Sequence, residues 1–428
     1  MAIRIFPPQE IIETRVKLPL SKSISTRALV MAYLTPGVST LPTEGISMCT
    51  DTAILRHSLE NTSTNVNIGA AGTSMRFLTA LYAAMPGREV TLDGSARMHE
   101  RPVGPLVEAL RSLGARIDYL GKEGFAPLRI SGRQLSGGSV DIDSATSSQY
   151  VSALMMIAPT MDAPLKIHLT GGGTASSPYI RMTAEMMRRR GVEAEISGYD
   201  IHVPNTPYLR TADDAEPDWS AATFWYEIAA LSAGWVTVDG LSADALQGDR
   251  GVATIFEHMG VNTEYTPEGA ELSALPDLYA RIDGDFADMP DAVPGIAVTA
   301  AMLGIPFRLS GVSALKVKEC DRLAALREEL LKFGIILESE VESGSDVIAW
   351  EGRRAHVREI PVIDTRDDHR IAMAFAPTAI FIPGIVIENP SVTDKSYPGF
   401  WEALRDAGFI VQDADSPFPE AFTTEGGE

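Results

Sequence analysis

The chain has 428 residues. A single hydrophobic core rarely serves a chain of this length, so two domains are expected. Hydrophobic residues make up 45% and charged residues 22%, which is typical of a globular protein. The formal net charge of −21 argues against nucleic acid or an anionic membrane as a partner, although a small anion can still bind where cations gather. Only Cys49 and Cys320 are present, which excludes a disulfide framework and a cysteine-based zinc cluster.

The amino terminus lacks the basic-then-apolar layout of a secretory signal. The longest apolar run, 371–387, is interrupted by Pro377 and Pro383, so no membrane span is expected. We therefore expect a cytoplasmic protein, and we expect it to be a monomer.

One pattern recurs six times along the chain: a turn rich in Ser, Thr or Asp leads into an Ala-rich apolar helix that usually ends near Gly or Pro. The copies begin at residues 21, 70, 145, 218, 289 and 366, most of them about 70 residues apart. This spacing indicates a protein assembled from repeated supersecondary units.

A second pattern lies between these copies: an amphipathic helix, a glycine stop and then a strand of alternating polarity. It is expected at 104–119, 179–196, 251–265, 322–338 and 400–412, with a poorer match near Asp51 that ends at Asn61. Six such strand–helix–strand–helix units predict an α/β fold. With a hinge at 204–218, residues 20–216 form a first domain, and residues 1–19 with 217–428 form a discontinuous second domain.

The amino ends of the six apolar helices are candidate anion sites. Each helix start carries unpaired N–H groups and a partial positive charge, which together attract anions. For a single copy, Ser, Thr or Asp at such a position is better explained as an N-cap. Six copies accompanied by Lys and Arg favour a ligand site.

Cationic groups stand at two of these starts in the first half. Lys22, Ser23 and Arg27 combine a point charge, a hydroxyl donor and a bidentate fork at a loop-to-helix transition. Gly72 lets an anion approach the backbone closely, and Arg101 precedes a further helix. A capped helix with solvated charges, or a surface ion pair, would have the same sequence.

Neutral hydrogen-bonding groups precede the third apolar helix and the amphipathic helix after it. They are Ser147, Ser148 and Gln149 in the first case, and Ser176 and Tyr179 in the second. Such groups suit a polyhydroxylated or phosphorylated ring, although capping is again the alternative.

The stretch KVKECDRL places Lys318 and Arg322 four residues apart, so that on a helix they share a face with Glu319 beside them. An acid held between cations at a helix start is suited to proton transfer. A solvated, charged first turn is the commoner use of such residues.

Three further polar residues complete the candidate site in the second half. Asp291 precedes an apolar helix, where an N-cap is the simpler explanation. Arg370 ends the DTRDDHR turn, which could also form a closed polar network. Lys395 stands on a loop in DKSYP, where a surface lysine is expected by default.

Together these motifs resemble the 5-enolpyruvylshikimate-3-phosphate synthase family. The resemblance runs from Lys22 to Lys395, and its most specific strings are SKSxSxR, AGTSMRF, RMHERPVGPLVEALRSLGA, SSQYVSALMMIAP, KVKECDRL, DDHRIAMA and DKSYP, in this order. It implies a two-domain inverse α/β barrel built from six repeated βαβαββ-type units. It also implies transfer of the enolpyruvyl group of phosphoenolpyruvate to the 5-hydroxyl of shikimate 3-phosphate, a step of chorismate and aromatic amino acid biosynthesis, with no cofactor and no metal.

The family pattern further implies a role for each candidate residue. Those implied to hold shikimate 3-phosphate are Lys22, Ser23, Arg27, Ser147, Ser148, Gln149, Ser176, Tyr179, Asp291 and Lys318. Those implied to hold phosphoenolpyruvate are Lys22, Gly72, Arg101, Gln149, Arg322, Arg370 and Lys395. The proton transfers fall to Asp291 and Glu319, assisted by Lys22, and glyphosate is implied as an inhibitor.

Two positions depart from the family pattern, because Ala70 and Ala314 stand where members commonly have Asn. Each change removes one potential hydrogen bond, worth about 0.5–1.5 kcal/mol. Two alternatives remain open: the sister transferases that act on UDP-N-acetylglucosamine and use a loop cysteine as acid, and a non-catalytic anion-binding protein.

Overall fold

A computed structural model describes residues 2–143, 147–171, 177–210, 215–342 and 344–422. The chain divides into two compact units. Unit 1 comprises Met1–Pro19, Pro217–Ala245 and Asp249–Glu428, and unit 2 comprises Leu20–Glu216 with the short piece Leu246–Gly248. Unit 2 is therefore inserted in unit 1, near its amino end.

The chain order β-α-β-α-β-β builds one sheet of unit 1 in full. Its elements are β14 (Ile282–Asp285), α9 (Val293–Leu303), β15 (Phe307–Ser310), α10 (Arg322–Leu331), β16 (Glu338–Glu342) and β17 (Ser345–Trp350). The strands lie in the order β14-β15-β17-β16, with the first pair parallel and the others antiparallel. A parallel pair needs a crossover, which α9 supplies.

Two more sheets of unit 1 have the same strand order. One belongs to the repeat made of β2 (Glu13–Val16), α7 (Trp219–Ser232), β11 (Trp235–Asp239), α8 (Val252–Glu257), β12 (Val261–Thr266) and β13 (Gly269–Ala274). The other belongs to the repeat made of β18 (Val362–Ile363), α11 (His369–Phe375), β19 (Ile385–Glu388), α12 (Phe400–Asp406), β20 (Ile410–Asp413) and β1 (Ala2–Phe6). The amino-terminal strand β1 thus completes the last repeat.

Unit 2 repeats the order twice more. The first copy contains β3 (Asn65–Asn67), α3 (Gly72–Ala83), β4 (Glu89–Asp93), α4 (Gly104–Ser112), β5 (Arg116–Tyr119) and β6 (Leu128–Ser131). The second contains β7 (Gly138–Asp143), α5 (Ser148–Ile157), β8 (Leu165–Thr170), α6 (Pro178–Arg189), β9 (Glu195–Ser197) and β10 (Asp200–Val203). The predicted α/β class is confirmed, and five of the six predicted βαβαββ units are complete among the described residues.

The remaining copy is represented by helices. It consists of α1 (Lys22–Leu34) and α2 (Thr50–Glu60), and residues 35–49 between them, all of which the structure describes, contain no strand. This connection carries two prolines and two glycines and lacks an alternating polar pattern, so it does not favour a strand.

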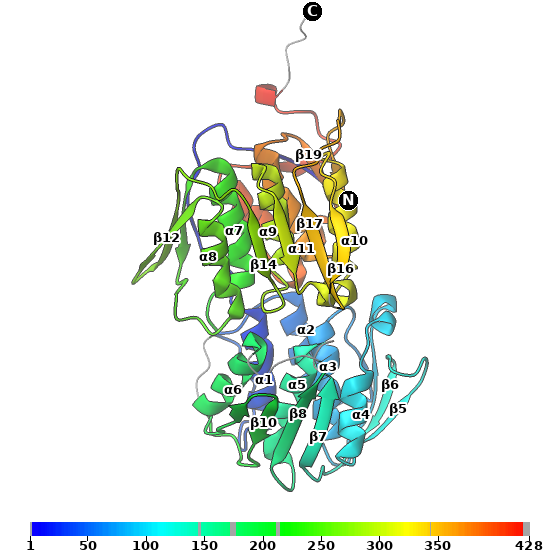
Figure 1. Ribbon diagram of the computed structural model, residues 1–428. Helices are drawn as coiled ribbons and strands as arrows, with labels where there is room; N and C mark the ends of the chain where they lie inside the picture. Colours follow the sequence, from blue (N-terminus) through cyan, green and yellow to red (C-terminus); the bar gives the residue numbers. More distant parts are fainter. Residues whose placement is uncertain (1, 144–146, 172–176, 211–214, 343, 423–428) are drawn as a thin grey trace, which may run out of the picture. The chain divides into compact units, whose positions relative to one another are not determined.

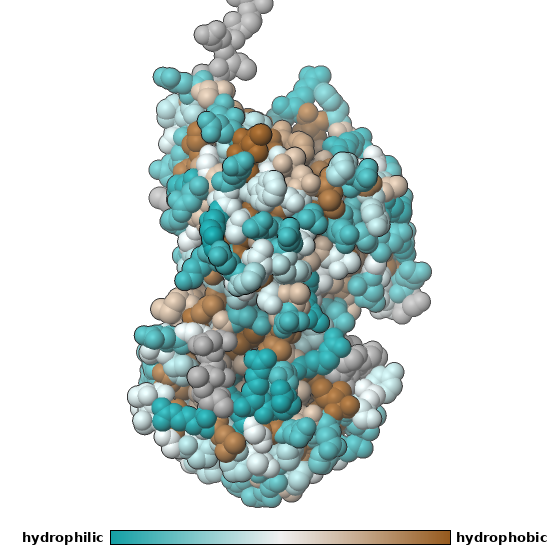
Figure 2. Space-filling view, turned by 90° about the vertical axis from the view of Figure 1, so that its left-hand side faces the viewer, coloured by the Kyte–Doolittle hydropathy of each residue, from teal (hydrophilic) through white to brown (hydrophobic). Residues whose placement is uncertain are grey.

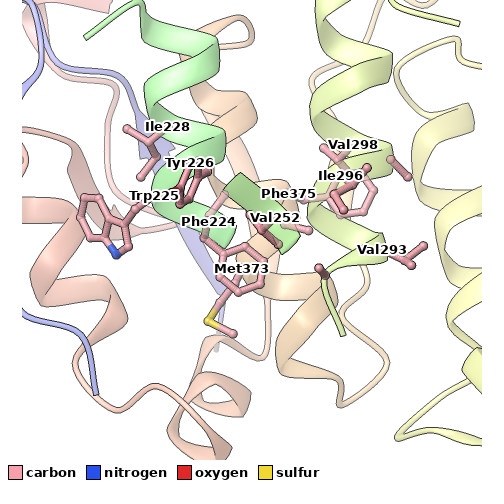
Figure 3. Packing of buried hydrophobic residues seen from close by; sticks show 14 of the residues in the cluster. Phe224, Trp225, Tyr226, Ile228, Val252, Val293, Ile296, Val298, Met373 and Phe375 are labelled. Carbon is pink, nitrogen blue, oxygen red and sulfur yellow. The ribbon is translucent and has the colours of Figure 1, made fainter. Parts of the chain in front are cut away.

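The six apolar segments of the sequence form α1, α3, α5, α7, α9 and α11, and their residues are largely buried. In unit 1, α7, α9 and α11 contact one another (Figure 1). Figure 3 shows Phe224, Ile296 and Met373, one from each helix, packed in this core. Gly295 permits the close approach of α9 to α7, because a Cβ there would lie 2.8 Å from the Thr223 methyl carbon.

The predicted glycine stops are confirmed at all five positions. Gly114, Gly191, Gly260, Gly334 and Gly408 have φ of 98°, 81°, 81°, 77° and 90°, a backbone conformation that costs other residues free energy. The weaker sixth match behaves differently, because the cap of α2 is extended, with φ −91°.

The surface is rich in charge, with 36 basic and 57 acidic residues in the sequence. On the face that Figure 2 shows, hydrophobic residues are scattered among hydrophilic ones. Among the residues that the structure describes, no helix has the length and apolar character that crossing a membrane requires.

A carboxyl group lies inside the core of unit 1. Glu227 on α7 is fully buried, and within the described residues neither of its oxygens has a hydrogen-bond partner. The neighbouring Thr299 hydroxyl donates to the Gly295 carbonyl at 2.7 Å. Burial raises the pKa of Glu227 well above its usual value of 4.5, which favours the protonated form in the folded protein.

We expect Glu227→Gln to be increasingly stabilising, relative to the wild type, as pH rises above about 4.5. Above this pH the unfolded chain ionises Glu227, whereas the folded chain keeps it protonated. The free energy of unfolding of the wild type therefore falls by about 1.4 kcal/mol per pH unit until the pH reaches the pKa of Glu227 in the folded protein. Urea unfolding of both proteins at several pH values measures the difference. Glu264→Gln, at an exposed glutamate on β12, controls for loss of charge. A difference that did not change with pH would contradict the assignment.

Candidate functional site

Lys22 and Ser23 occupy the first turn of α1 in unit 2. Ser21 is the N-cap, its hydroxyl accepting from the Ile24 N–H. The Lys22 ammonium lies 3.1 Å from a carboxylate oxygen of Asp51, and both side chains are largely buried. The helix start therefore presents a cation whose position is set by a neighbouring carboxylate.

Arg27 lies one turn further along α1 and is buried. Its guanidinium donates to the Thr183 hydroxyl at 2.7 Å, the Ser152 hydroxyl at 3.0 Å and the Ser23 carbonyl at 2.9 Å. Burial lowers the pKa of Arg27 to about 10, so it remains a cation at neutral pH. Tyr179, at the start of α6, lies beside it, with 5.9 Å between the guanidinium carbon and the ring centroid. All three acceptors are neutral, so an anionic ligand nearby would offset the cost of burying this charge.

Gly72 begins α3 against the guanidinium of Arg101. A Cβ at position 72 would lie 2.5 and 2.6 Å from the two terminal nitrogens of Arg101, so no other residue fits without moving it. The next residue, Thr73, accepts from the Gln149 amide at 3.1 Å. This bond places the amino ends of α3 and α5 side by side.

Ser147 is the N-cap of α5, its hydroxyl accepting from the Gln149 N–H at 3.2 Å, and Ser148 is the first helical residue. Capping thus accounts for the Ser147 hydroxyl in this structure. Ser176 lies outside the described residues. Unit 2 therefore collects the other predicted residues of the first half around the amino ends of α1, α3, α5 and α6.

Arg322 is the centre of a second group, in unit 1. Its Nε lies 2.8 Å from Asp368, its Nη1 2.8 Å from Asp291 and its Nη2 3.1 Å from Glu319. The Arg322 side chain is 1% exposed and that of Asp368 is 0% exposed. Burial would lower the pKa of Arg322, but the three carboxylates outweigh it and raise the pKa well above its usual value.

Asp291 is surrounded by cations. Besides Arg322, Lys318 lies 3.5 Å from one of its oxygens and Arg370 3.6 Å from the other. Burial alone would raise the pKa of Asp291, but Lys318, Arg370 and Arg322 outweigh it and hold the pKa well below its usual value. Asp291 is not an N-cap, because Ala292 occupies that position before α9.

Glu319 bridges two cations. One carboxylate oxygen lies 3.1 Å from Arg322 Nη2, and the other lies 3.2 Å from Lys395 Nζ. Lys395 ends the short helical segment η6 (Pro390–Lys395) after β19, and its side chain is largely buried rather than extended on the surface. Glu319 therefore lies between Arg322 and Lys395, whereas the sequence suggested Lys318 and Arg322 as its cationic neighbours.

Arg370 projects from the first turn of α11, whose N-cap Asp368 accepts from the Arg370 N–H at 2.9 Å. Its Nε and Nη1 are buried and make no hydrogen bond within the described residues. Near it, Asp249 accepts from the Ser220 hydroxyl. Burial, reinforced by the charge of Asp291, raises the pKa of Asp249 to about 7.

One detail of the sequence prediction is wrong. Lys318 and Arg322 do not share a helix face, because α10 begins at Arg322 and Lys318 is extended. The Asp321 side chain caps α10 by accepting from the Ala324 N–H at 3.0 Å, which stops the helix from extending back to Lys318. Both cations nevertheless reach Asp291.

Sequence reasoning missed several carboxylates of these groups. For Asp51 the sequence offers only weak evidence, a polar first turn on a helix that matches the repeat poorly. Asp368 is recognisable in the sequence only as part of a charged turn. For Asp249 the sequence offers none, because it follows an irregular loop. Within the described part of the chain, no cluster of three or more His, Cys, Asp or Glu side chains is arranged to hold a metal ion.

The fold is that of an α/β protein, and each of its two units carries a group of Lys and Arg side chains of the kind that suits small anionic ligands. A family model described as EPSP synthase (3-phosphoshikimate 1-carboxyvinyltransferase) matches residues 43–404. A 3-phosphoshikimate 1-carboxyvinyltransferase of Bacteroides fragilis is 44% identical over 403 residues, covering 94% of this chain and 97% of that protein. One of Methanospirillum hungatei is 38% identical over 346 residues, covering 79% and 78%. The chain therefore belongs to the EPSP synthase family.

A solved structure of EPSP synthase from Acinetobacter baumannii shares the fold. The TM-score is 0.72 at 20% sequence identity, and the match covers 96% of this chain and 100% of that one. The predicted fold class and family are confirmed.

We expect Arg322→Met to destabilise the protein by about 3–5 kcal/mol, because it leaves buried carboxylates without their counter-ion. Urea unfolding measures this change. Arg308→Met is the matched control: Arg308 also pairs with two carboxylates, at 2.9 and 2.7 Å, but on the exposed surface of unit 1, and its loss should shift the unfolding midpoint only slightly. Equal shifts for the two variants would argue against a buried charge cluster.

Proposed function

We propose that this protein transfers the enolpyruvyl group of phosphoenolpyruvate to the 5-hydroxyl of shikimate 3-phosphate and releases phosphate. The observation that carries the proposal is the pair of acids in unit 1. Glu319 lies between Arg322 and Lys395, and Asp291 lies among further cations. Addition and elimination require an acid–base group at each end of the reacting bond, with cations around the carboxylate and phosphates.

Two overlapping sets of residues are proposed for the two ligands, and Lys22 and Gln149 belong to both. The set proposed for shikimate 3-phosphate is Lys22, Ser23, Arg27, Ser147, Ser148, Gln149, Ser176, Tyr179, Asp291 and Lys318. The set proposed for phosphoenolpyruvate is Lys22, Gly72, Arg101, Gln149, Arg322, Arg370 and Lys395. The Nε and Nη1 of Arg370, which have no hydrogen-bond partner among the described residues, support its part, because two buried donors suit an anionic ligand. We propose residues 20–216 and 1–19 with 217–428 as the two substrate-binding domains.

The reaction proceeds in two stages. Asp291 accepts the proton of the 5-hydroxyl as that oxygen bonds to the central carbon of phosphoenolpyruvate, and Glu319 gives a proton to the methylene carbon, which becomes a methyl group. The bond from that carbon to the phosphate oxygen then breaks, the departing phosphate takes the proton held by Asp291, and a methyl proton returns to Glu319. Lys22 assists by stabilising negative charge on the phosphate.

The environment of Asp291 suits an acceptor that is activated by its substrates. In the free protein, cations keep Asp291 ionised and weakly basic. Phosphate and carboxylate groups bound to Lys318, Arg370 and Arg322 would partly neutralise those cations and raise the pKa of Asp291. Proton transfer would then be favoured only when the ligands are in place.

The sister transferases that act on UDP-N-acetylglucosamine use a cysteine as the acid. Neither cysteine of this chain is well suited to that role. Cys49 and Cys320 are both buried. Cys320 lies 3.5 Å from Asp368, and burial together with this carboxylate raises the pKa of the thiol. We further propose that the protein is a monomer whose partners are small molecules, and that it binds neither nucleic acid nor a membrane.

Incubation of the protein with both substrates tests the function. Phosphate should be released only when phosphoenolpyruvate and shikimate 3-phosphate are present together. Glu319→Gln should lower kcat by about 100-fold or more, because the proton donor is lost while the shape is kept. Glu264→Gln, on the surface strand β12, is the control for removing one carboxylate. Phosphate release from one substrate alone, or near-normal turnover of Glu319→Gln, would contradict the proposal.

We also propose glyphosate as an inhibitor competing with phosphoenolpyruvate. Gly72→Ala should reduce inhibition and raise the KM for phosphoenolpyruvate, because the new methyl group would displace the Arg101 guanidinium. Inhibition constants of both proteins measure the effect. Gly121→Ala is a matched control, since neither glycine has a positive φ and a Cβ at position 121 meets only the Pro127 side chain, at an ordinary contact distance of 3.6 Å. An unchanged inhibition constant in Gly72→Ala would defeat the steric argument.

A further inference from the structure

The turn before α11 has an uncommon backbone. Arg366 and Asp367 have φ of 51° and 57°, so two successive residues with side chains adopt the left-handed conformation. Each such residue costs free energy and persists only where surrounding bonds hold it. The residue that follows is Asp368, the N-cap of α11 and the partner of Arg322.

Side chains on both sides hold this turn. The Arg366 N–H donates to Asp364 at 2.9 Å, and the Arg366 guanidinium pairs with Glu328 on α10. The amide of Asn389 donates to the Asp367 carboxylate at 2.6 Å. This last bond comes from a different loop, the one that follows β19.

Asn389 is itself constrained. It has φ 45° and immediately precedes η6, the segment that ends at Lys395. The parallel strands β18 and β19 bring the two loops to the same end of one sheet, and α11 contacts η6. The bond between Asn389 and Asp367 therefore links the turn that orients Arg370 to the segment that carries Lys395.

We propose that Asn389 is a positioning residue, which holds the left-handed turn at Asp367 and thereby orients Arg370 and Lys395 toward a common ligand. The inference rests on the proposed function, because it assigns those two cations to phosphoenolpyruvate. Asn389 and Asp367 are both exposed, so their bond is not needed to fill the core. Its loss should alter the site more than the stability of the fold.

Exchange of the two side chains tests the proposal. Asn389→Asp sets two carboxylates against each other, and we expect kcat/KM for phosphoenolpyruvate to fall about tenfold, with shikimate 3-phosphate affinity unchanged. In the double variant Asp367→Asn with Asn389→Asp, the amide and the carboxylate are exchanged and can bond in the reverse direction. It should recover to within about threefold of the wild type. Asn262→Asp, which adds the same charge to exposed strand β12, should have no effect.

Hydrogen exchange of the peptide spanning 366–373 provides a readout that needs no substrate. The Arg370 N–H, bonded to Asp368, should exchange faster in Asn389→Asp and return to the wild-type rate in the double variant. Unchanged kinetics in Asn389→Asp, or a double variant as impaired as the single one, would overturn the positioning role. A wild-type protein that released no phosphate would instead refute the proposed function, and the exchange rates would still decide whether Asn389 holds the turn.

Discussion

The buried ion cluster around Arg322 is the interaction on which unit 1 depends. A single guanidinium contacts Asp291, Glu319 and Asp368, which come from three separate parts of the chain. Charges removed from water are tolerated only when they are paired and hydrogen-bonded, so the three carboxylates must remain close to this one cation. Since Asp368 also caps α11, the same requirement orients Arg370.

Repetition of one supersecondary unit explains how such a cluster can form. In each complete copy a buried apolar helix, here called the inner helix, follows the first strand. In unit 1 the three inner helices α7, α9 and α11 contact one another. The charged residues before α9 and α11 consequently meet at Arg322, and in unit 2 the first turns of α3 and α5 are joined by the bond between Gln149 and Thr73. Helix ends supply partial positive charge, and the added Lys and Arg side chains strengthen it.

Membership of the EPSP synthase family and the local geometry support the same chemistry by independent routes. The family match rests on sequence over residues 43–404, whereas the paired acids rest on distances between side chains. The exposed bond between Asn389 and Asp367 joins the two loops that carry Arg370 and Lys395, and it is proposed to position these cations without itself contacting the ligand.

The sequence by itself determined the repeat, the inner helices and the glycine stops, because these depend on local periodicity and on backbone conformations that only certain residues adopt. Its motifs also supplied the candidate site residues, but not which of them lie together. It misassigned Lys318 to a helix face, since Asp321 could be recognised as the cap only from its bond to Ala324. Only the tertiary structure could pair Lys22 with Asp51, Glu319 with Lys395 and Asn389 with Asp367. Those pairs join residues that lie up to 76 positions apart, and their distances follow from how strands and helices pack, which no local pattern encodes.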